Sequence, residues 1–170
     1  MIVNVEVSIS DDLISEANGL TDDDVPEPGL LQIWASAAYL NDTPAVASLL
    51  VTTSDEIQEL NKQFRDKDKP TNVLSFPMQS PEEVDVDLLG DIVLCAAVIK
   101  QEAKQQSKSE TSHWAHMVVH GMLHLQGYDH IKDDDAEEME RLEIDILDHL
   151  GFENPYECIT EKTLSKKEMK

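Results

Sequence analysis

Three histidines in one short stretch are the residues of this chain best suited to bind a metal ion. The segment H-G-M-L-H-L-Q-G-Y-D-H contains His120, His124 and His130. Histidines four residues apart leave the same side of a helix, about 6 Å apart along its axis. Gly127 can end that helix in a left-handed conformation, so that His130 returns toward the other two rings. Three imidazoles with an open fourth position are typical of a catalytic zinc site, so we predict one Zn²⁺ per chain.

Two other interpretations of these histidines remain open. They could be buried core residues with ordinary hydrogen bonds. The same spacing also occurs in the extended zincin motif of metalloproteases, H-E-x-x-H-x-x-G-x-x-H. In that motif a Glu beside the first His is the general base, and Gly121 stands there in this chain, which disfavours peptide hydrolysis by that route. A glycine inside a helix costs about 1 kcal/mol relative to alanine. Gly121 therefore predicts a close approach by a neighbouring strand or by a substrate backbone.

The formal charge of −22 limits which partners the chain can bind. Non-specific affinity for nucleic acid is mostly electrostatic, so a uniformly acidic surface would repel RNA. An RNA substrate would need a local basic patch, and the sequence offers two sets of cations that could line one face near the metal. Each lysine could equally be a solvated surface residue. The sets are Lys62, Arg65, Lys67 and Lys69 in one stretch, and Lys100, Lys104 and Lys108 at successive i+4 positions.

Three longer motifs carry a family resemblance. They are H-W-A-H-M-V-V-H-G-M-L-H-L-Q-G-Y-D-H at 113–130, N-K-Q-F-R-D-K-D-K-P-T-N-V-L-S-F-P at 61–77 and L-G-D-I-V-L-C at 89–95. Together they resemble the YbeY family of bacterial metal-dependent endoribonucleases, over about residues 1–157. The resemblance implies a zinc ion held by His120, His124 and His130, cleavage of single-stranded RNA, and a role in ribosomal RNA maturation and ribosome quality control. It also implies catalytic roles for Arg65 and His120. The expected partner besides RNA is a small-subunit ribosomal protein, and neither DNA nor a membrane is expected as a partner.

The chemistry expected of such a site leaves the general base open. Zinc could act as a Lewis acid on a phosphoryl oxygen, generate hydroxide at neutral pH, or do both. Arg65 would stabilise negative charge on the phosphate with its planar fork of donors. The base could be metal hydroxide, a carboxylate such as Asp91, or the RNA's own 2′-hydroxyl deprotonated by a partner. Asp129 could orient a ring or simply form the turn. A metalloprotease and a non-catalytic ribosome-assembly factor with a structural zinc are the alternative functions.

Composition predicts one domain in a reducing compartment. A chain of 170 residues with 41% hydrophobic content can bury one core. We place the single domain at 1–157 and a C-terminal tail at 158–170. Apolar and polar residues alternate at the N-terminus, which predicts a strand and not a signal peptide. The semi-apolar stretch 30–40 is too short to span a bilayer. Cys95 and Cys158 form no C-x-x-C pair and fit reduced thiols. We therefore predict a cytoplasmic protein.

Hydrophobic periodicity predicts an α+β fold, with a small mixed sheet of about four strands covered by several helices on one face. The helix at 110–126 is apolar around most of its circumference. It should be central and buried, with a stripe of His113, His116, His120 and His124 facing a cleft. We expect strands at 2–7, 46–52, 73–76 and 91–95, helices at 30–41, 53–65, 95–107, 110–126 and 133–150, and a long loop at 79–87 that is either mobile or a lid.

Overall fold

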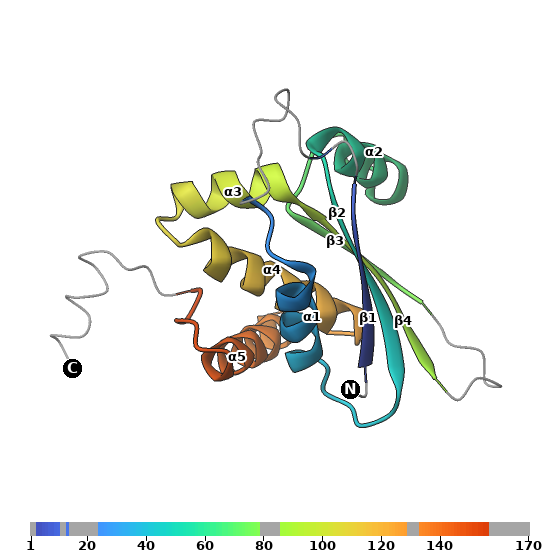
Figure 1. Cartoon of the computed structure of the whole chain (residues 1–170), viewed down its shortest axis with the longest axis vertical. Coiled ribbons are helices and arrows are strands. Elements are labelled where there is room, and N and C mark those ends of the chain that lie inside the picture. Colours follow the sequence, from blue (N-terminus) through green and yellow to red (C-terminus); the bar gives the residue numbers. More distant parts are fainter. Residues whose placement is uncertain (1–2, 11–12, 14–23, 79–85, 129–132, 157–170) are drawn as a thin grey trace, which may run out of the picture.

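A four-stranded sheet and five helices form the part of the chain that the computed structural model describes, namely residues 3–10, 13, 24–78, 86–128 and 133–156. Figure 1 shows their arrangement. In chain order the elements are β1 (Val3–Ile9), α1 (Pro28–Ala37), β2 (Ala45–Thr52), α2 (Ser54–Arg65), β3 (Val73–Pro77), β4 (Asp87–Cys95), α3 (Ala96–Gln105), α4 (Glu110–Leu125) and α5 (Asp133–His149).

The sheet is mixed, as predicted, and β3 forms one of its edges. The strand order is β1-β2-β4-β3. The first three of these strands are parallel, while β3 runs antiparallel to β4. A bulge interrupts the pairing of β2 with β4, and Gly90 lies in it with a φ of +131°. A Cβ at Gly90 would lie 2.2 Å from the carbonyl oxygen of Phe76 in the neighbouring strand β3, so only glycine fits where β4 passes β3.

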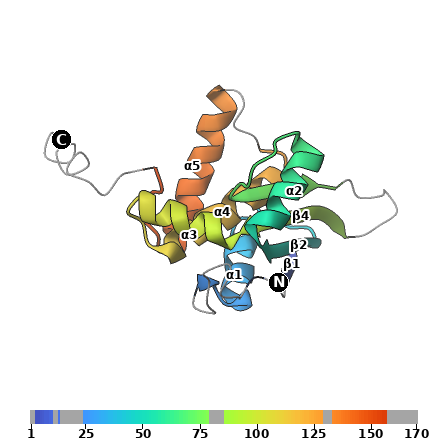
Figure 2. The same cartoon turned by 90° about the horizontal axis from the view of Figure 1, so that it is seen from above.

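Helix α4 is the centre of the fold. It packs against β3, β4, α1, α3 and α5, and both views show it between the sheet and α5 (Figures 1 and 2). Its apolar residues join the main core together with Ile92 and Leu94 of β4. Most residues of α4 are buried.

The glycine in α4 is explained by strand packing. A Cβ on Gly121 would lie 2.9 Å from Cγ2 of Ile92, a distance at which one of the two groups must move. The carbonyl of Gly121 also accepts a hydrogen bond from Oγ of Ser75 at 3.2 Å. Of the two explanations predicted for this glycine, a neighbouring strand is the correct one.

Helix α2 lies on the opposite face of the sheet. Alternate residues of a strand point to opposite faces, and Val93 and Cys95 form a second, smaller core with Ile57 of α2 and Leu74 of β3. The main core does lie on one face of the sheet, as expected. The expectation omitted α2, which covers part of the other face. The sequence places α2 well, because Thr53 caps it by accepting from the Glu56 amide at 3.2 Å and Asp66 ends it in a left-handed conformation.

The predicted elements all occur, with shifts at their ends. The helix predicted at 30–41 begins at Pro28 and ends at Ala37, in agreement with the preference for proline in a first helical turn. The strand predicted at 91–95 begins at Asp87, because pairing continues across the bulge. The tail predicted at 158–170 and most of the loop predicted at 79–87 lie outside the described residues. Among the described helices, none combines the length and the apolar character needed to cross a bilayer.

Candidate metal centre

His120 and His124 turn one ring nitrogen each toward the same point. Their Nε2 atoms lie 3.0 Å apart, and the ring centroids are 4.5 Å apart. The Nδ1 atoms point elsewhere, that of His120 to Oε1 of Glu143 at 2.9 Å and that of His124 to the carbonyl of Tyr128 at 2.9 Å. A carbonyl oxygen only accepts, so Nδ1 of His124 carries the hydrogen, and in the neutral ring Nε2 presents a lone pair.

This geometry fits a metal ion. A carboxylate also only accepts, so Nδ1 of His120 donates to Glu143, and in a neutral ring its Nε2 likewise presents a lone pair. Two lone pairs facing each other repel unless a cation, either a proton or a metal ion, lies between them. Imidazole nitrogens bound at about 2.0–2.1 Å to one tetrahedral zinc ion lie roughly 3.3 Å apart, close to the separation found here. His130, the third predicted ligand, lies outside the described residues, as does Asp129.

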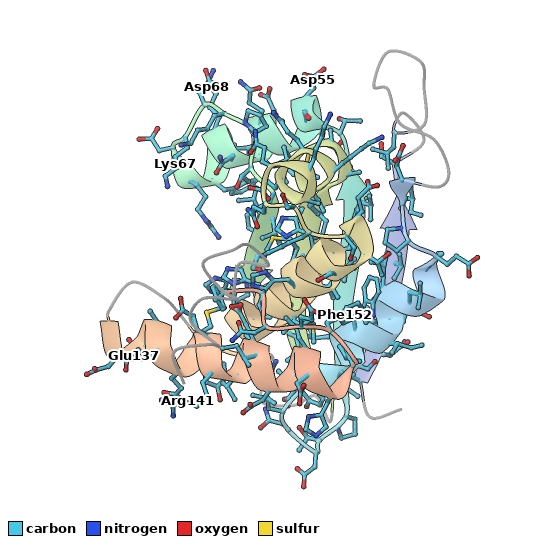
Figure 3. The ribbon with its side chains drawn as sticks, turned by 90° about the vertical axis from the view of Figure 1, so that its left-hand side faces the viewer. Asp55, Lys67, Asp68, Glu137, Arg141 and Phe152 are labelled. Carbon is cyan, nitrogen blue, oxygen red and sulfur yellow. The ribbon has the colours of Figure 1, made fainter. Side chains whose placement is uncertain are left out.

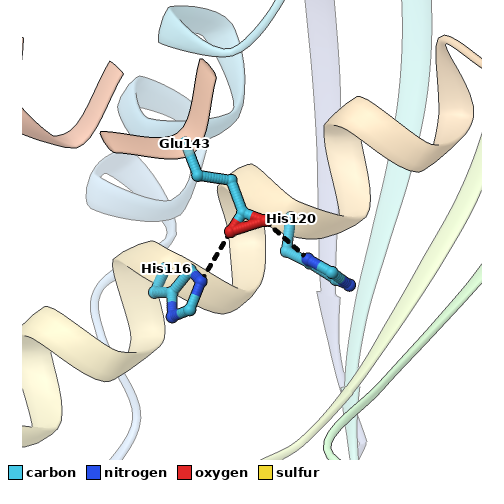
Figure 4. A group of neighbouring side chains, drawn as sticks. All are labelled: His116, His120 and Glu143. Carbon is cyan, nitrogen blue, oxygen red and sulfur yellow. Dashed lines mark hydrogen bonds and ion pairs between the residues drawn. The ribbon is translucent and has the colours of Figure 1, made fainter. Parts of the chain in front are cut away.

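Glu143 of α5 reaches into the same region from the next helix. Figure 4 shows its carboxylate between His116 and His120. Its side chain is fully buried, and Oε2 accepts from Nε2 of His116 at 2.7 Å and from Oη of Tyr156 at 2.6 Å. The ligand atoms of His116, His120 and Glu143 lie within 4.8 Å of one another, so this group could itself hold a metal ion. Direct hydrogen bonds also account for the arrangement, with Nε2 of His120 left facing His124.

The buried carboxylate is charged despite its surroundings. Burial acts most strongly on Glu143 and opposes its ionisation, but the hydrogen bonds and charges of His116 and His120 outweigh burial and lower the pKa of Glu143 to about 2. Burial lowers the pKa of His116, and the bond to Glu143 only partly offsets this. Burial, followed by the bond to Glu143, raises the pKa of Tyr156 well above its usual range. Tyr156 therefore remains a donor, and Glu143 an acceptor, at neutral pH.

A cleft of about 640 Å³ opens beside the two histidines. One wall is the C-terminal half of α4 with the turn that follows it, and the other is the chain from Thr71 to Ser75, including the edge of β3. Arg65, at the end of α2, lines the cleft together with His120 and His124. The structure therefore brings Arg65 to the two described histidines predicted as ligands.

The guanidinium of Arg65 is held by the protein. Nη2 donates to the carbonyl of Ser75 at 2.7 Å and Nη1 to the carbonyl of Phe64 at 3.2 Å, while the group lies 5.1 Å from the centroid of the Phe76 ring. The Ser75 carbonyl thus points away from β4. Because the N–H and C=O of one strand residue point to the same side of an antiparallel strand, the Ser75 N–H also lies on this outer edge.

Several residues singled out in the sequence lie elsewhere. Asp91 does not reach the histidines, because Ile92 faces α4 and its neighbour in the strand must face the other way. The suggestion that Asp91 is the general base of this site is therefore wrong. Lys100 forms an ion pair with Asp24 at 2.9 Å. Lys100, Lys104 and Lys108 were expected to line one face near the metal, but none of them is among the described residues lining the cleft. The face formed by these three lysines is therefore not part of the cleft wall.

Sequence reasoning missed the acidic partners of the histidine stripe. Nε2 of His113 bonds Oε1 of Glu102 at 2.9 Å, and His116 and His120 share Glu143. One signal was available for Glu143. It falls four residues after Met139 and four before Leu147, so a charged residue occupies the apolar stripe of α5.

Comparison with known proteins identifies similar chains. The family model described as Endoribonuclease YbeY matches residues 30–151. A protein named Endoribonuclease YbeY, from Alteromonas mediterranea, is 51% identical over 137 residues, which cover 79% of this chain and 87% of the relative. The solution structure of TM1509 from Thermotoga maritima is 22% identical, with a TM-score of 0.48, and the match covers 91% of this chain and 99% of that one.

Proposed function

The chain belongs to the YbeY endoribonuclease family, and from this membership we propose that it is a zinc-dependent endoribonuclease. Its substrate would be single-stranded RNA, cut during ribosomal RNA maturation and ribosome quality control in the cytoplasm. The observation that carries this proposal is the convergence of two imidazole nitrogens 3.0 Å apart in a cleft that also contains an arginine. Metal ligands beside a guanidinium suit a phosphodiester, since the metal and the fork of donors can both act on phosphate oxygens.

His120, His124 and, by its spacing, His130 would hold the zinc ion. When bound, the ion would supply Lewis acidity toward a phosphate oxygen and would lower the pKa of a water molecule. Arg65 would bind the phosphate and stabilise the negative charge that develops on it. Its bonds to the carbonyls of Ser75 and Phe64 orient the guanidinium before substrate arrives, which reduces the ordering required in the transition state. The Ser75 N–H, on the same edge of β3, offers a further donor.

The acidic surface suits a basic protein partner, and we propose a small-subunit ribosomal protein in this role. With a net charge of −22, long-range attraction would favour basic proteins over free nucleic acid. A metalloprotease is disfavoured, because the position of the protease base is Gly121, and the space of its missing side chain is filled by Ile92.

Cleavage of a single-stranded RNA oligonucleotide, measured with and without a chelator, tests the proposal. Purified protein should contain about one zinc ion per chain, and the chelator should abolish cleavage. His124→Ala should lose both metal and cleavage. His149→Ala is the matched control, because this histidine lies in the last turn of α5, away from His120 and His124, and bonds the Asp145 carbonyl of its own helix at 3.0 Å.

Two results would contradict the proposal. Cleavage that persists in His124→Ala with unchanged metal content would remove the metal assignment. Unfolding of the wild-type protein on chelation, measured by circular dichroism, with no RNA cleavage before chelation, would instead indicate a structural zinc in a non-catalytic factor.

A further inference from the structure

We propose that Glu143 is a positioning residue of the metal centre, which holds His120 with Nδ1 protonated so that Nε2 is turned toward His124. The inference rests on the proposed zinc site and goes beyond the three predicted ligands. It assigns a role to a buried carboxylate on another helix.

The geometry around the carboxylate supports this role. Oε1 of Glu143 lies 2.9 Å from Nδ1 of His120, while Nε2 of the same ring lies 3.0 Å from Nε2 of His124. The two nitrogens of one imidazole therefore have different partners, and a neutral ring carries one hydrogen. Because a carboxylate can only accept, it selects the tautomer with the hydrogen on Nδ1. A carboxylate that bonds the far nitrogen of a histidine ligand in this way fixes the ring and makes it a stronger donor to metal.

The position of Glu143 in α5 points to the same conclusion. It lies among buried apolar residues of that helix, Met139, Ile146 and Leu147, where another apolar side chain would extend the core. An ionised group in this position costs several kcal/mol unless it is well paired. A position retained for packing alone would be better filled by leucine.

Two further donors hold the carboxylate in place. Oε2 accepts from Nε2 of His116 at 2.7 Å and from the hydroxyl of Tyr156 at 2.6 Å. His116 is itself buried, with no hydrogen-bond partner for Nδ1 among the described residues, so its hydrogen belongs on Nε2, facing Glu143. His120, His116 and Tyr156 thus each donate to an acceptor-only group, which sets the direction of these three hydrogen bonds.

The direct test compares zinc affinity in two variants of matched chemistry. Glu143→Gln retains the shape of the side chain but replaces one acceptor oxygen by an amide donor. We expect zinc affinity, measured by competition with a chromophoric chelator, to fall by about 10–100-fold. Glu102→Gln is the control, because Glu102 also pairs with a histidine of α4, His113, at 2.9 Å, whereas neither of the two described ligands, His120 and His124, is among its hydrogen-bond partners. Its zinc affinity should equal that of wild type.

A second readout separates positioning from general damage to the fold. The ¹⁵N shifts of the His120 ring should show a hydrogen on Nδ1 in wild type and a mixture of tautomers in Glu143→Gln. The visible spectrum of the cobalt-substituted protein should change in Glu143→Gln and not in Glu102→Gln. If Glu143→Gln does not fold, Tyr156→Phe takes its place. It removes one donor to the carboxylate at a residue that is 47% exposed, and zinc affinity should fall in the same direction by a smaller factor.

The inference is overturned if Glu143→Gln, or Tyr156→Phe in its place, binds zinc as tightly as wild type with the same His120 tautomer. It is also overturned if Glu102→Gln weakens zinc binding equally. Failure of the proposed function is a different result, in which wild-type protein binds no zinc. In that case the tautomer of His120 in Glu143→Gln still decides whether Glu143 fixes the hydrogen of this ring on Nδ1.

Discussion

Arg65 is the residue whose role the structure makes most testable, because the fold orients it without taking up all its donors. A guanidinium has five N–H groups, and two of its nitrogens bond the carbonyls of Ser75 and Phe64. We predict that Arg65→Ala keeps its metal and its fold but cleaves single-stranded RNA about 100-fold more slowly, the scale of losing one transition-state donor. Arg65→Lys should restore only part of the rate, since an ammonium cannot bind phosphate in a planar fork. Single-turnover cleavage of one RNA measures both effects.

The matched control for Arg65 is Lys62→Ala. Lys62 lies in the last turn of the same helix, is exposed, and forms a loose ion pair with Asp68 at 3.9 Å. Such a pair contributes at most about 1 kcal/mol to stability, and turnover should not change. Near-normal cleavage by Arg65→Ala would mean that Arg65 only stabilises the edge of β3.

Glu143 should also make the metal-free protein sensitive to acid. Its pKa is lower in the folded chain, about 2, than the ordinary 4.5. Its stabilisation is therefore fully present above pH 4.5 and is lost as the pH falls from there toward 2. The difference corresponds to roughly 3 kcal/mol. Glu143→Gln should accordingly be destabilised most near pH 7, and the gap to wild type should narrow below pH 4.5.

Urea unfolding of metal-free wild type and Glu143→Gln at several pH values measures this gap. Glu138→Gln, an exposed position of the same helix, should show no such narrowing. A gap that stays constant down to pH 3 would be inconsistent with a lowered pKa at Glu143.

At the residue scale, spacing alone predicts part of the site. His120 and His124 follow from helical geometry, because four residues make about one turn. Arg65 came from the resemblance of its motif rather than from any spacing. Glu143 could not be found in this way, because its histidine partners belong to α4, more than twenty residues earlier, and only packing brings the two helices together.

At the scale of elements, the contact of α4 with β4 is tight enough to be tested by one methyl group. Gly121→Ala gains about 1 kcal/mol in helix propensity. It also places a Cβ 2.9 Å from Cγ2 of Ile92, a branch fixed directly to the strand, and overpacking of this kind costs typically 1–3 kcal/mol. We predict a net loss of up to about 2 kcal/mol in the free energy of unfolding, measured by urea denaturation.

A double-mutant cycle isolates the clash. In an Ile92→Ala background the opposing atoms are absent, so Gly121→Ala should become stabilising by about 1 kcal/mol, the propensity term alone. If Gly121→Ala has the same effect in both backgrounds, its cost does not arise from Ile92.

The elements themselves were predictable, because apolar periodicity sets each helix and strand. The first and last residues of these helices and strands were harder to predict. Strand β4 begins at Asp87 rather than at residue 91, since Gly90 allows pairing with β2 to continue through a bulge. A glycine inside a strand pattern indicates such a bulge. The local sequence does not show which strand pairs with β4 on both sides of the bulge. The same limit explains why α2 was not expected on the opposite face.

At the scale of the whole molecule, the net charge of −22 and an RNA substrate are compatible only if binding is confined to a local group of cations. Ion pairs with Asp24 and Asp68 already engage Lys100 and Lys62. Arg65 lines the cleft, and Lys67 and Lys69 are exposed in the loop that leads from α2 into the cleft wall. Figure 3 shows Lys67 in this loop, beyond the end of α2. Within the described part of the chain, Arg65, Lys67 and Lys69 are thus the three cations in or beside the cleft that would meet the phosphates.

This small number predicts a shallow dependence of RNA binding on salt. For single strands the slope of log affinity against log salt is about −0.7 for each phosphate contacted, so three contacts give about −2. Lys67→Glu with Lys69→Glu should weaken binding and reduce the slope toward about −0.7, while Lys104→Glu, exposed on α3, should change neither. Fluorescence anisotropy with a labelled 2′-O-methyl RNA, which cannot be cleaved through its 2′-hydroxyl, measures the slope from 50 to 300 mM salt. A wild-type slope steeper than about −4 would require more than five phosphate contacts and would place most of the RNA-binding cations outside this loop.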